Sequence, residues 1–449
     1  MQWFEPERSR RILALAGPII GGMASQTVLN LVDAAMVGRL GPAAQAGVGL
    51  GSFTFFVLAN LVIGLGTGVQ AIVSRRDGED RPQEAGAALD NALVLALLVA
   101  LPLGYVLAQA ADLIFPLLST DDAVQDGGSS YLAIRLMALG VVTANYCFRG
   151  FWNGIGQSRV YMGTLIVIHT LNIVLNWVLI FGVPALSIPR MGIQGAALAS
   201  ALAAAGGTVC YSALVLVKRD VRESYRPFRF ASLRKDVVKG LVKLSWPEAL
   251  RGIGLMAGFL LFLRLHSALG TRETAAGTIL VQLASVGFLP ALGFGLAGAT
   301  FVGRALGRKD PAEARVIIWQ TVRIALALMI VPLSVLLVAP DLVLSVFTPD
   351  ALVIEMARPG LRILAATFAF DAVQFVIIYS LLGAGATRWA AAVQLTAQYL
   401  VLLPLAWVLG VLLGGGVVGL WAGMIGSRAL LAVLAVRKLR GDSWERIDV

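Results

Sequence analysis

The sequence predicts an all-α integral membrane protein with twelve transmembrane helices in two six-helix lobes. Of its 449 residues, 58% are hydrophobic and 14% are charged, and the mean hydropathy is +0.82. A soluble domain carries about 25% charged residues. The apolar residues gather into twelve segments long enough to cross a bilayer, since about 20 residues suffice. In addition, the second half of the chain repeats the first.

The predicted spans follow one another through short connections, with one exception. Between the sixth and seventh spans lies a polar stretch, residues 218–241, which we interpret as a cytoplasmic linker. It would join an N-terminal lobe, 1–217, to a C-terminal lobe with a cytoplasmic tail, 242–449. The spans are predicted at 12–38, 52–74, 86–114, 131–153, 160–185, 194–217, 242–268, 277–303, 314–338, 359–383, 389–412 and 416–436.

Lysine and arginine set the predicted orientation. Of 36 such residues, 25 lie on the side that holds both ends of the chain and the linker, and four lie in the opposite connections. The positive-inside rule therefore places both termini in the cytoplasm. The net charge of +10 could also suit nucleic acid, but these basic residues sit in short connections between spans, so we expect no nucleic-acid partner. Cys147 and Cys210 lie in apolar segments and indicate neither a disulfide nor a metal framework.

The two halves match when the sequence is shifted by 229 residues, without a gap from Pro18 to Ala85, a stretch that covers the first two spans. Six spans per half return the chain to its starting side, so the repeat is parallel. Secondary transporters use such repeats, with the substrate site between halves that rock. The matched pairs include Pro18 with Pro247, Gly64 and Gly66 with Gly293 and Gly295, and Pro82 and Glu84 with Pro311 and Glu313.

Asp33 is the strongest candidate for a functional residue. It lies deep in the first span, where a carboxylate is expensive and marks a functional site by default. Asn172 and Asn176 lie one turn apart on one face of the fifth span, and Ser200 lies two turns into the sixth, all at a similar depth. This set suits a hard cation, or a carboxylate whose proton comes and goes. Inside the membrane the dielectric constant is low, and this favours the neutral form of Asp33.

Simpler interpretations of these residues remain open. Asp33 could be a buried acid satisfied by an asparagine, and the polar groups could hold helices together by hydrogen bonds. Pro18 and Pro247 could be hinges, or kinks shared by the two halves. His169 and His266 could relay protons, but lone histidines in apolar spans are more often structural.

The C-terminal half carries Asp371 in the tenth span and Arg428 in the twelfth. A buried pair of Asp371 with Arg428, or with Arg264, would be structural; the alternative is a second coupling site. Five in-span arginines of this half would repel a cationic substrate and favour an anionic or zwitterionic one, unless they pair or snorkel. They are Arg251, Arg264, Arg323, Arg362 and Arg428.

Several motifs together resemble the multidrug and toxic compound extrusion (MATE) family, and most closely its DinF branch. They are LVDAAMVGRLG (31–41), TLNIVLNWVLIFG (170–182), GIQGAALAS (192–200), GFGLAGATFVGRALG (293–307), FDAVQ (370–374) and GGGVVGLWAG (414–423). The resemblance implies a two-lobe exporter that moves amphipathic, usually cationic compounds outward against entry of H⁺ or Na⁺.

The resemblance also implies a cation site in the N-terminal lobe. It comprises an acid in the first span, an asparagine and an acid one turn apart in the fifth, and a hydroxyl in the sixth. Asp33, Asn172 and Ser200 match, whereas Asn176 replaces an acid. One carboxylate fewer weakens a Na⁺ site and favours H⁺. In the second lobe of another branch an acid follows the proline by eight residues; here that residue is Leu255.

We therefore predict a proton-coupled efflux antiporter of the bacterial inner membrane, monomeric, with no cofactor beyond its coupling ion. The main alternative is a flippase or exporter for a lipid-linked, anionic or zwitterionic substrate. The sequence contains no GxxxxGK[ST], HExxH or GxSxG motif, so neither ATP-driven transport nor common hydrolase chemistry is expected. We predict that the protein is not an enzyme.

Overall fold

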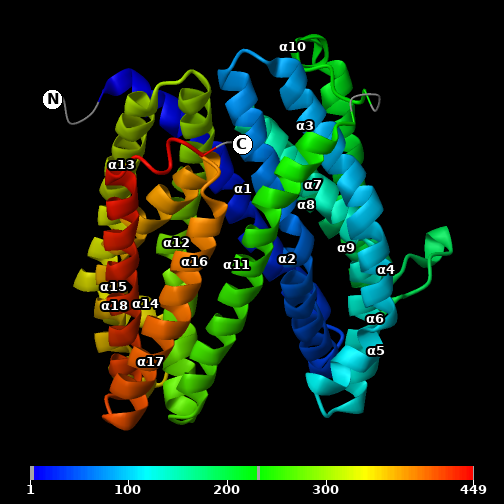
Figure 1. The fold of residues 1–449 in the computed structure, drawn as a ribbon. Helices are drawn as coiled ribbons and strands as arrows, with labels where there is room; N and C mark the ends of the chain where they lie inside the picture. The colour runs from blue at the N-terminus through cyan, green and yellow to red at the C-terminus, as the bar shows by residue number, and fades with distance from the viewer. Residues whose placement is uncertain (1–4, 230–232, 448–449) are drawn as a thin grey trace. The chain divides into compact units, whose positions relative to one another are not determined.

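The computed structural model describes residues 5–229 and 233–447, and within them the chain is almost entirely helical (Figure 1). The ends of the chain and residues 230–232 of the predicted linker lie outside the described residues. The helices are α1 (Pro6–Gly38), α2 (Pro42–Gly78), α3 (Pro82–Leu95), α4 (Leu101–Gln109), α5 (Ala111–Ile114), α6 (Asp122–Met137), α7 (Leu139–Gly154), α8 (Ser158–Phe181), α9 (Gly192–Val217), α10 (Arg219–Ser224), α11 (Lys235–Ser267), α12 (Thr271–Gly307), α13 (Pro311–Val338), α14 (Pro340–Ser345), α15 (Ala351–Gly383), α16 (Thr387–Thr396), α17 (Leu403–Ala406) and α18 (Gly416–Arg440).

The predicted fold class is confirmed. Among the described residues, 11 helices are long and apolar enough to cross a membrane, counting α3 with α4 and α16 with α17 as single spans across the π-helical turns that join them. The bent pair α6 and α7 makes up to 12. Only one isolated bridge, Val183 with Ile188, has strand-like pairing within these residues.

The fourth span differs from a simple helix. Prediction placed it at 131–153, and the structure divides it into α6 and α7, which meet at a 51° bend around Ala138. The bend lies where α4 approaches most closely: a Cβ at Gly104 would stand 2.3 Å from the Leu136 carbonyl, and one at Gly140 would stand 2.9 Å from the Leu101 Cβ. Hydropathy alone does not register such a break.

The described chain forms two compact units, and their bounds differ from the predicted lobes. One unit contains Met1–Ile20 and Leu250–Val449, and the other contains Gly21–Ala249. The first turns of α1 therefore belong with the second half, while the linker and the first turns of α11 belong with the first half. Both crossings fall two residues after a helix proline, Pro18 or Pro247.

Close contacts at two glycines explain why the first turns of α1 and of α11 each belong to the unit of the other half. A Cβ at Gly64 of α2 would lie 2.7 Å from the Ser245 carbonyl and 3.3 Å from the Ala249 nitrogen. A Cβ at Gly293 of α12 would lie 2.4 Å from the Ile20 side chain. The repeat matches Gly64 with Gly293. In each half, therefore, the second helix (α2 or α12) packs against the first turns of the first helix of the other half (α11 or α1).

The repeat also fixes the turns before α2 and α12. Gly41 has φ 110° and Gly270 has φ 146°, conformations that side chains rarely adopt. These two glycines occupy matching positions in the repeat, directly before the long second helix of each half.

The linker is tied to α3 by a buried acid. Asp90 is fully buried, and its carboxylate accepts hydrogen bonds from the Phe228 nitrogen at 2.7 Å and the Arg229 nitrogen at 3.0 Å. Asn91 accepts from the Arg234 nitrogen at 3.1 Å. Tyr225 donates to Asp77 and packs edge-on against Phe151. The end of the linker is helical, because α11 already begins at Lys235.

We expect Asp90→Ala to release the linker. The variant loses two charge-assisted hydrogen bonds to main-chain nitrogens, so local opening becomes more frequent by about tenfold or more. Trypsin cleavage after Arg229 of the purified protein should accelerate by that factor, because cleavage follows the open population. The control is Glu223→Ala, which removes only the exposed pair with Arg219. Equal cleavage rates in both variants would contradict the assignment.

The C-terminal segment is held by α13 in a comparable way. The Arg315 guanidinium donates to the carbonyls of Leu439 and Arg440, each at 2.9 Å, and pairs with Asp442 at 2.7 Å and with Glu445. Trp444 beside it is fully buried. One turn further along α13, Gln320 donates to the Glu5 carbonyl at 2.8 Å and to Ser9 at 2.7 Å. Both described ends of the chain thus pack on the same end of α13 (Figure 1).

Candidate coupling site

Two polar stripes face each other on α1 and α8, both within the unit Gly21–Ala249. On α1, Gln26 donates to Asn30 at 3.0 Å, and Asp33 follows one turn later. Helical spacing aligns these three side chains, because residues three and four apart share a face. On α8, His169, Asn172 and Asn176 are likewise three and four residues apart, and they are buried.

Asp33 receives a direct hydrogen bond from the α8 stripe. The Asn176 amide nitrogen donates to Asp33 Oδ1 at 2.7 Å and to Asn172 Oδ1 at 3.0 Å. The Asn172 amide lies 3.0 Å from the same carboxyl oxygen. Asn176 and Asn172 are only 1% and 3% exposed, so no bulk water competes for these contacts. Asp33 itself is half-buried.

Ser200 on α9 completes the group. Asn172 lies between Asp33 and Ser200, with 3.1 Å between its amide and Ser200 Oγ. Glycines let α9 approach α8 closely: a Cβ at Gly195 would lie 2.5 Å from the Leu179 carbonyl, and one at Gly207 would lie 2.4 Å from Ile168. The structure thus brings together all four residues that the sequence singled out in this half, Asp33, Asn172, Asn176 and Ser200.

Two features around Asp33 were missed by sequence reasoning. The Arg135 guanidinium of α6 lies close enough to act electrostatically on Asp33, and it stacks 4.4 Å over the Phe55 ring. His169 contacts Gln26 through Nε2 and Oε1 at 3.2 Å, which joins α1 to α8 a second time. The seven-residue spacing of Gln26 and Asp33 could have indicated the second contact. Nothing in the pattern of α6 aims Arg135 at Asp33.

In the other unit, the structure pairs Asp371 with Arg428. The guanidinium Nε lies 3.4 Å from Asp371 Oδ1, and Gln374 donates to the same oxygen at 3.1 Å. Asp371 is 5% exposed. Arg428 also lies 5.2 Å over the Phe375 ring. Arg264, the alternative partner, is exposed. The charges of Asp371 and Arg428, which both lie inside helices, therefore compensate each other.

The remaining arginines of this half do not converge on one point. Arg251 is buried; it donates to Gln394 at 2.6 Å and to the Tyr379 hydroxyl at 3.1 Å. Arg362 is exposed, and Arg323 is half-buried. Arg251 and Arg428 nevertheless stack on neighbouring rings of α15, since Tyr379 and Phe375 are one turn apart.

His266 and the two prolines are placed as follows. His266 is buried, and its Nδ1 lies 3.1 Å from the carbonyl of Phe262 one turn earlier in α11. Pro18 and Pro247 lie inside α1 and α11, and both helices continue through them. The hinge role stays a prediction; the unit boundary two residues beyond each proline is consistent with it.

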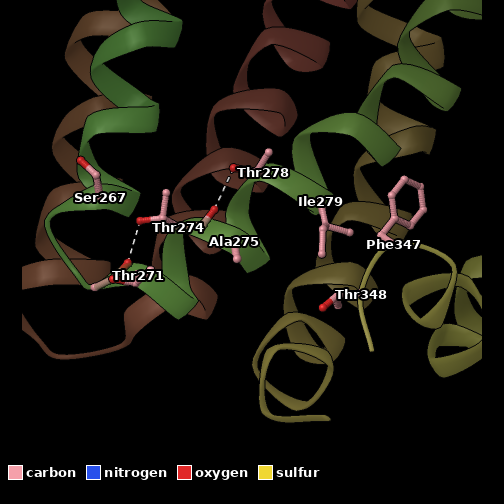
Figure 2. A pocket seen from close by; sticks show the side chains of 9 residues that line it. Ser267, Thr271, Thr274, Ala275, Thr278, Ile279, Phe347 and Thr348 are labelled. Carbon is pink, nitrogen blue, oxygen red and sulfur yellow. Dashed lines mark hydrogen bonds between the residues drawn. The ribbon is translucent and has the colours of Figure 1, made fainter. Parts of the chain in front are cut away.

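An open depression of about 710 Å³ lies at the turn between α11 and α12, and Figure 2 shows its hydroxyl-rich lining. Thr274 donates to the Gly270 carbonyl at 2.6 Å, and Thr278 donates to the Thr274 carbonyl at 2.8 Å. These two hydroxyls therefore donate to main-chain carbonyls of the turn and of α12. None of the predicted site residues lines the depression.

Two repeated six-helix halves and an acid set among amides inside the helices define a multi-pass membrane transporter. The chain belongs to the MatE family, whose model matches residues 18–178 and 247–408. The two matches begin at Pro18 and Pro247, the pair that the repeat superimposes. This confirms the MATE resemblance and the prediction that the protein is a transporter rather than an enzyme. The assignment to the DinF branch stays a prediction.

Curated relatives and solved structures agree with this assignment. The chain is 25% identical to the probable multidrug resistance protein NorM of Thermotoga maritima, covering 98% of this chain and 94% of that one. It is 28% identical to the multidrug resistance protein NorM of Burkholderia vietnamiensis, covering 94% and 91%. An outward-facing multidrug resistance MATE family transporter has the same fold, with a TM-score of 0.88, 21% identity and coverage of 96% and 95%.

Proposed function

We propose that this protein is a secondary active antiporter that exports amphipathic, cationic organic compounds in exchange for H⁺, with Asp33 as the proton carrier. The observation that carries the proposal is the site around Asp33. One acid inside the helices contacts two buried amides, the nearer at 2.7 Å. A carboxyl group held in this way can exist as a neutral acid at low cost, and its hydrogen bonds change when the proton leaves.

The donors around Asp33 favour H⁺ over Na⁺ as the coupling ion. A sodium site needs several oxygen ligands, whereas Asn176 presents its nitrogen to the acid. Asn176 Oδ1 is buried without a hydrogen-bond partner, and this oxygen keeps Na⁺, bound by Asp33, Asn172, Asn176 and Ser200, as the second candidate.

The substrate class rests on relatives. Those named multidrug resistance proteins cover most of the chain, and a multidrug exporter handles amphipathic compounds. Transport by alternating access would use the two repeated halves, which we propose as lobes 1–217 and 242–449. Pro18 and Pro247 would act as hinges, since each lies two residues before its helix passes from one compact unit to the other.

A second candidate is export of an anionic, zwitterionic or lipid-linked substrate. It is favoured by Arg251 and Arg428, which stack on Tyr379 and Phe375 of α15. One structure with the same fold, from Pyrococcus furiosus (TM-score 0.87, 20% identity, coverage of 96% and 95%), is described as having a binding pocket of reverse polarity that suggests a different function. That likeness concerns the fold alone. The pairing of Arg428 with Asp371 weakens this candidate.

We further propose that the protein is a monomer in the bacterial inner membrane with both termini in the cytoplasm. The packing of both described ends on one end of α13 supports placement on a common side. The excess of Lys and Arg on that side supports a cytoplasmic position.

The test is transport by the purified protein in liposomes. Ethidium efflux should be driven by a proton gradient alone and should be insensitive to a sodium gradient at constant pH. Transport driven by sodium alone would replace H⁺ with Na⁺ in the proposal. If neither gradient moves ethidium, an anionic dye such as fluorescein is the next probe, and its transport would support the second candidate.

A further inference from the structure

We propose that Arg149 of α7 binds a carboxylate group of the exported compound, so that the substrates include compounds with a carboxylate on an aromatic ring beside their cationic group. The proposal rests on the proposed function, because it takes the ligand to be the compound that is exported, and it specifies one substrate class. Arg149 lies within the fourth span, and no acidic side chain of residues 5–229 and 233–447 forms an ion pair with it.

The repeat supplies a direct comparison for the ring on which Arg149 stacks. This ring is Tyr146, and the shift of 229 residues matches it with Phe375. The structure places the two aromatic residues alike. A Cβ at Gly66 would lie 2.5 Å from the Tyr146 carbonyl, and one at the matched Gly295 would lie 2.9 Å from the Phe375 carbonyl. The surroundings of the two rings can therefore be compared position by position.

An arginine stacks on each of these matched rings, but only one of the two arginines has an acid. Arg428 lies 5.2 Å over its ring, and its Nε lies 3.4 Å from Asp371 Oδ1. Arg149 lies 4.4 Å over its ring, and the residue matched to Asp371 is Val142, which carries no charge. A charge inside the membrane is costly without a partner. An anionic ligand would compensate Arg149 as Asp371 compensates Arg428.

The neighbouring amide does not replace the missing acid. Gln374 donates to the acid of its own half at 3.1 Å, and the matched residue is Asn145. Asn145 is engaged with α9 instead: it donates to the Ala204 carbonyl at 2.8 Å and accepts from the Thr208 hydroxyl at 3.0 Å. Its amide oxygen is thus already bonded, and the guanidinium of Arg149 keeps donors for a ligand.

The groups around Arg149 suit an aromatic carboxylate. Arg149 and Tyr146 are half-buried, so part of the guanidinium is accessible to a ligand. The Tyr161 hydroxyl of α8, in a side chain that is 5% exposed, interacts with the same guanidinium. The planar fork of an arginine matches both oxygens of a carboxylate. The phenol rings beside it offer apolar faces on which the aromatic ring of a ligand can stack.

Two dyes with one fluorophore test the site. Rhodamine 110 is a zwitterion with a free carboxylate, and rhodamine 123 is its cationic methyl ester. Binding of each dye to the purified protein in detergent is measured by fluorescence anisotropy. Arg149→Gln should weaken the binding of rhodamine 110 by about tenfold or more, because a hydrogen-bonded charge pair is lost. The affinity for rhodamine 123 should be unchanged, which also shows that the variant is folded.

Two further variants separate a specific site from an effect of charge. Arg149→Lys keeps the charge without the planar fork, so it should recover only part of the affinity for rhodamine 110. Arg159→Gln is the matched control, because Arg159 is an exposed arginine in the first turn of α8. It removes the same charge and should leave the binding of both dyes as in the wild type.

The outcomes distinguish this proposal from the proposed function. Equal affinity of the wild type and Arg149→Gln for rhodamine 110 would overturn the carboxylate site, and so would a wild type that does not bind this dye. An equal loss in Arg149→Gln and Arg159→Gln would also overturn it, since net charge would then be the cause. If rhodamine 110 binds through Arg149 but a proton gradient moves neither dye in proteoliposomes, the proposed function fails and the binding site stands.

Discussion

The Asp33→Asn variant is expected to lose gradient-driven efflux and to remain folded. An asparagine has the shape of the acid, and its carbonyl can accept the hydrogen bond that Asn176 donates to Asp33 at 2.7 Å. It also resembles the neutral acid in charge, so burial costs no more than before. What it cannot do is release a proton, and an antiporter without an exchangeable proton has no driving force.

Two measurements distinguish loss of coupling from loss of structure. Ethidium efflux from proteoliposomes under a proton gradient should fall to the background rate, whereas the melting temperature should be unchanged or higher. Asp112→Asn is the control, because Asp112 is an exposed acid of α5. It removes the same charge and should leave efflux unchanged. Efflux at the wild-type rate in Asp33→Asn would contradict the proposal and direct attention to Asp371.

Much of the site around Asp33 was accessible from the sequence, because it depends on helical periodicity and depth. Residues 172 and 176 share a face in any α-helix, and the lengths of the spans place them near the depth of Asp33 and Ser200. The hydrogen bonds between these residues follow once α1, α8 and α9 are adjacent. Arg135 could not be found in this way, because its position depends on the bend between α6 and α7.

The division into two compact units likewise could not be predicted from the sequence. Hydropathy places a boundary in the polar linker, 218–241, since no apolar segment occurs there. The structure instead carries both the linker and the start of α11 with the first half, because Asp90 holds the linker and Gly64 packs against the start of α11. These are contacts between residues more than 100 positions apart. The matched prolines show where α1 and α11 pass from one unit to the other, but they do not show which unit each end of the helix joins.

The second large effect is expected at the pair of Asp371 and Arg428. Arg428→Met removes the guanidinium 3.4 Å from an acid that is 5% exposed. Gln374 alone cannot compensate the charge, so we expect a loss of about 3 kcal/mol in the free energy of unfolding. Arg358→Met is the control: it breaks the exposed pair with Asp341, which contributes about 0–1 kcal/mol. Thermal unfolding in detergent should show a large fall in melting temperature only for Arg428→Met.

The double variant Asp371→Asn/Arg428→Met tests what the pair is for. If the pair is structural, removing both charges should recover most of the lost stability, because an uncompensated buried charge is the main cost. Gradient-driven efflux should then be retained. A double variant that is stable but fails to transport would show that Asp371 takes part in coupling. Retained efflux would leave Asp33 as the proton carrier, so that one half of the repeat binds the proton while the other satisfies its acid with an arginine.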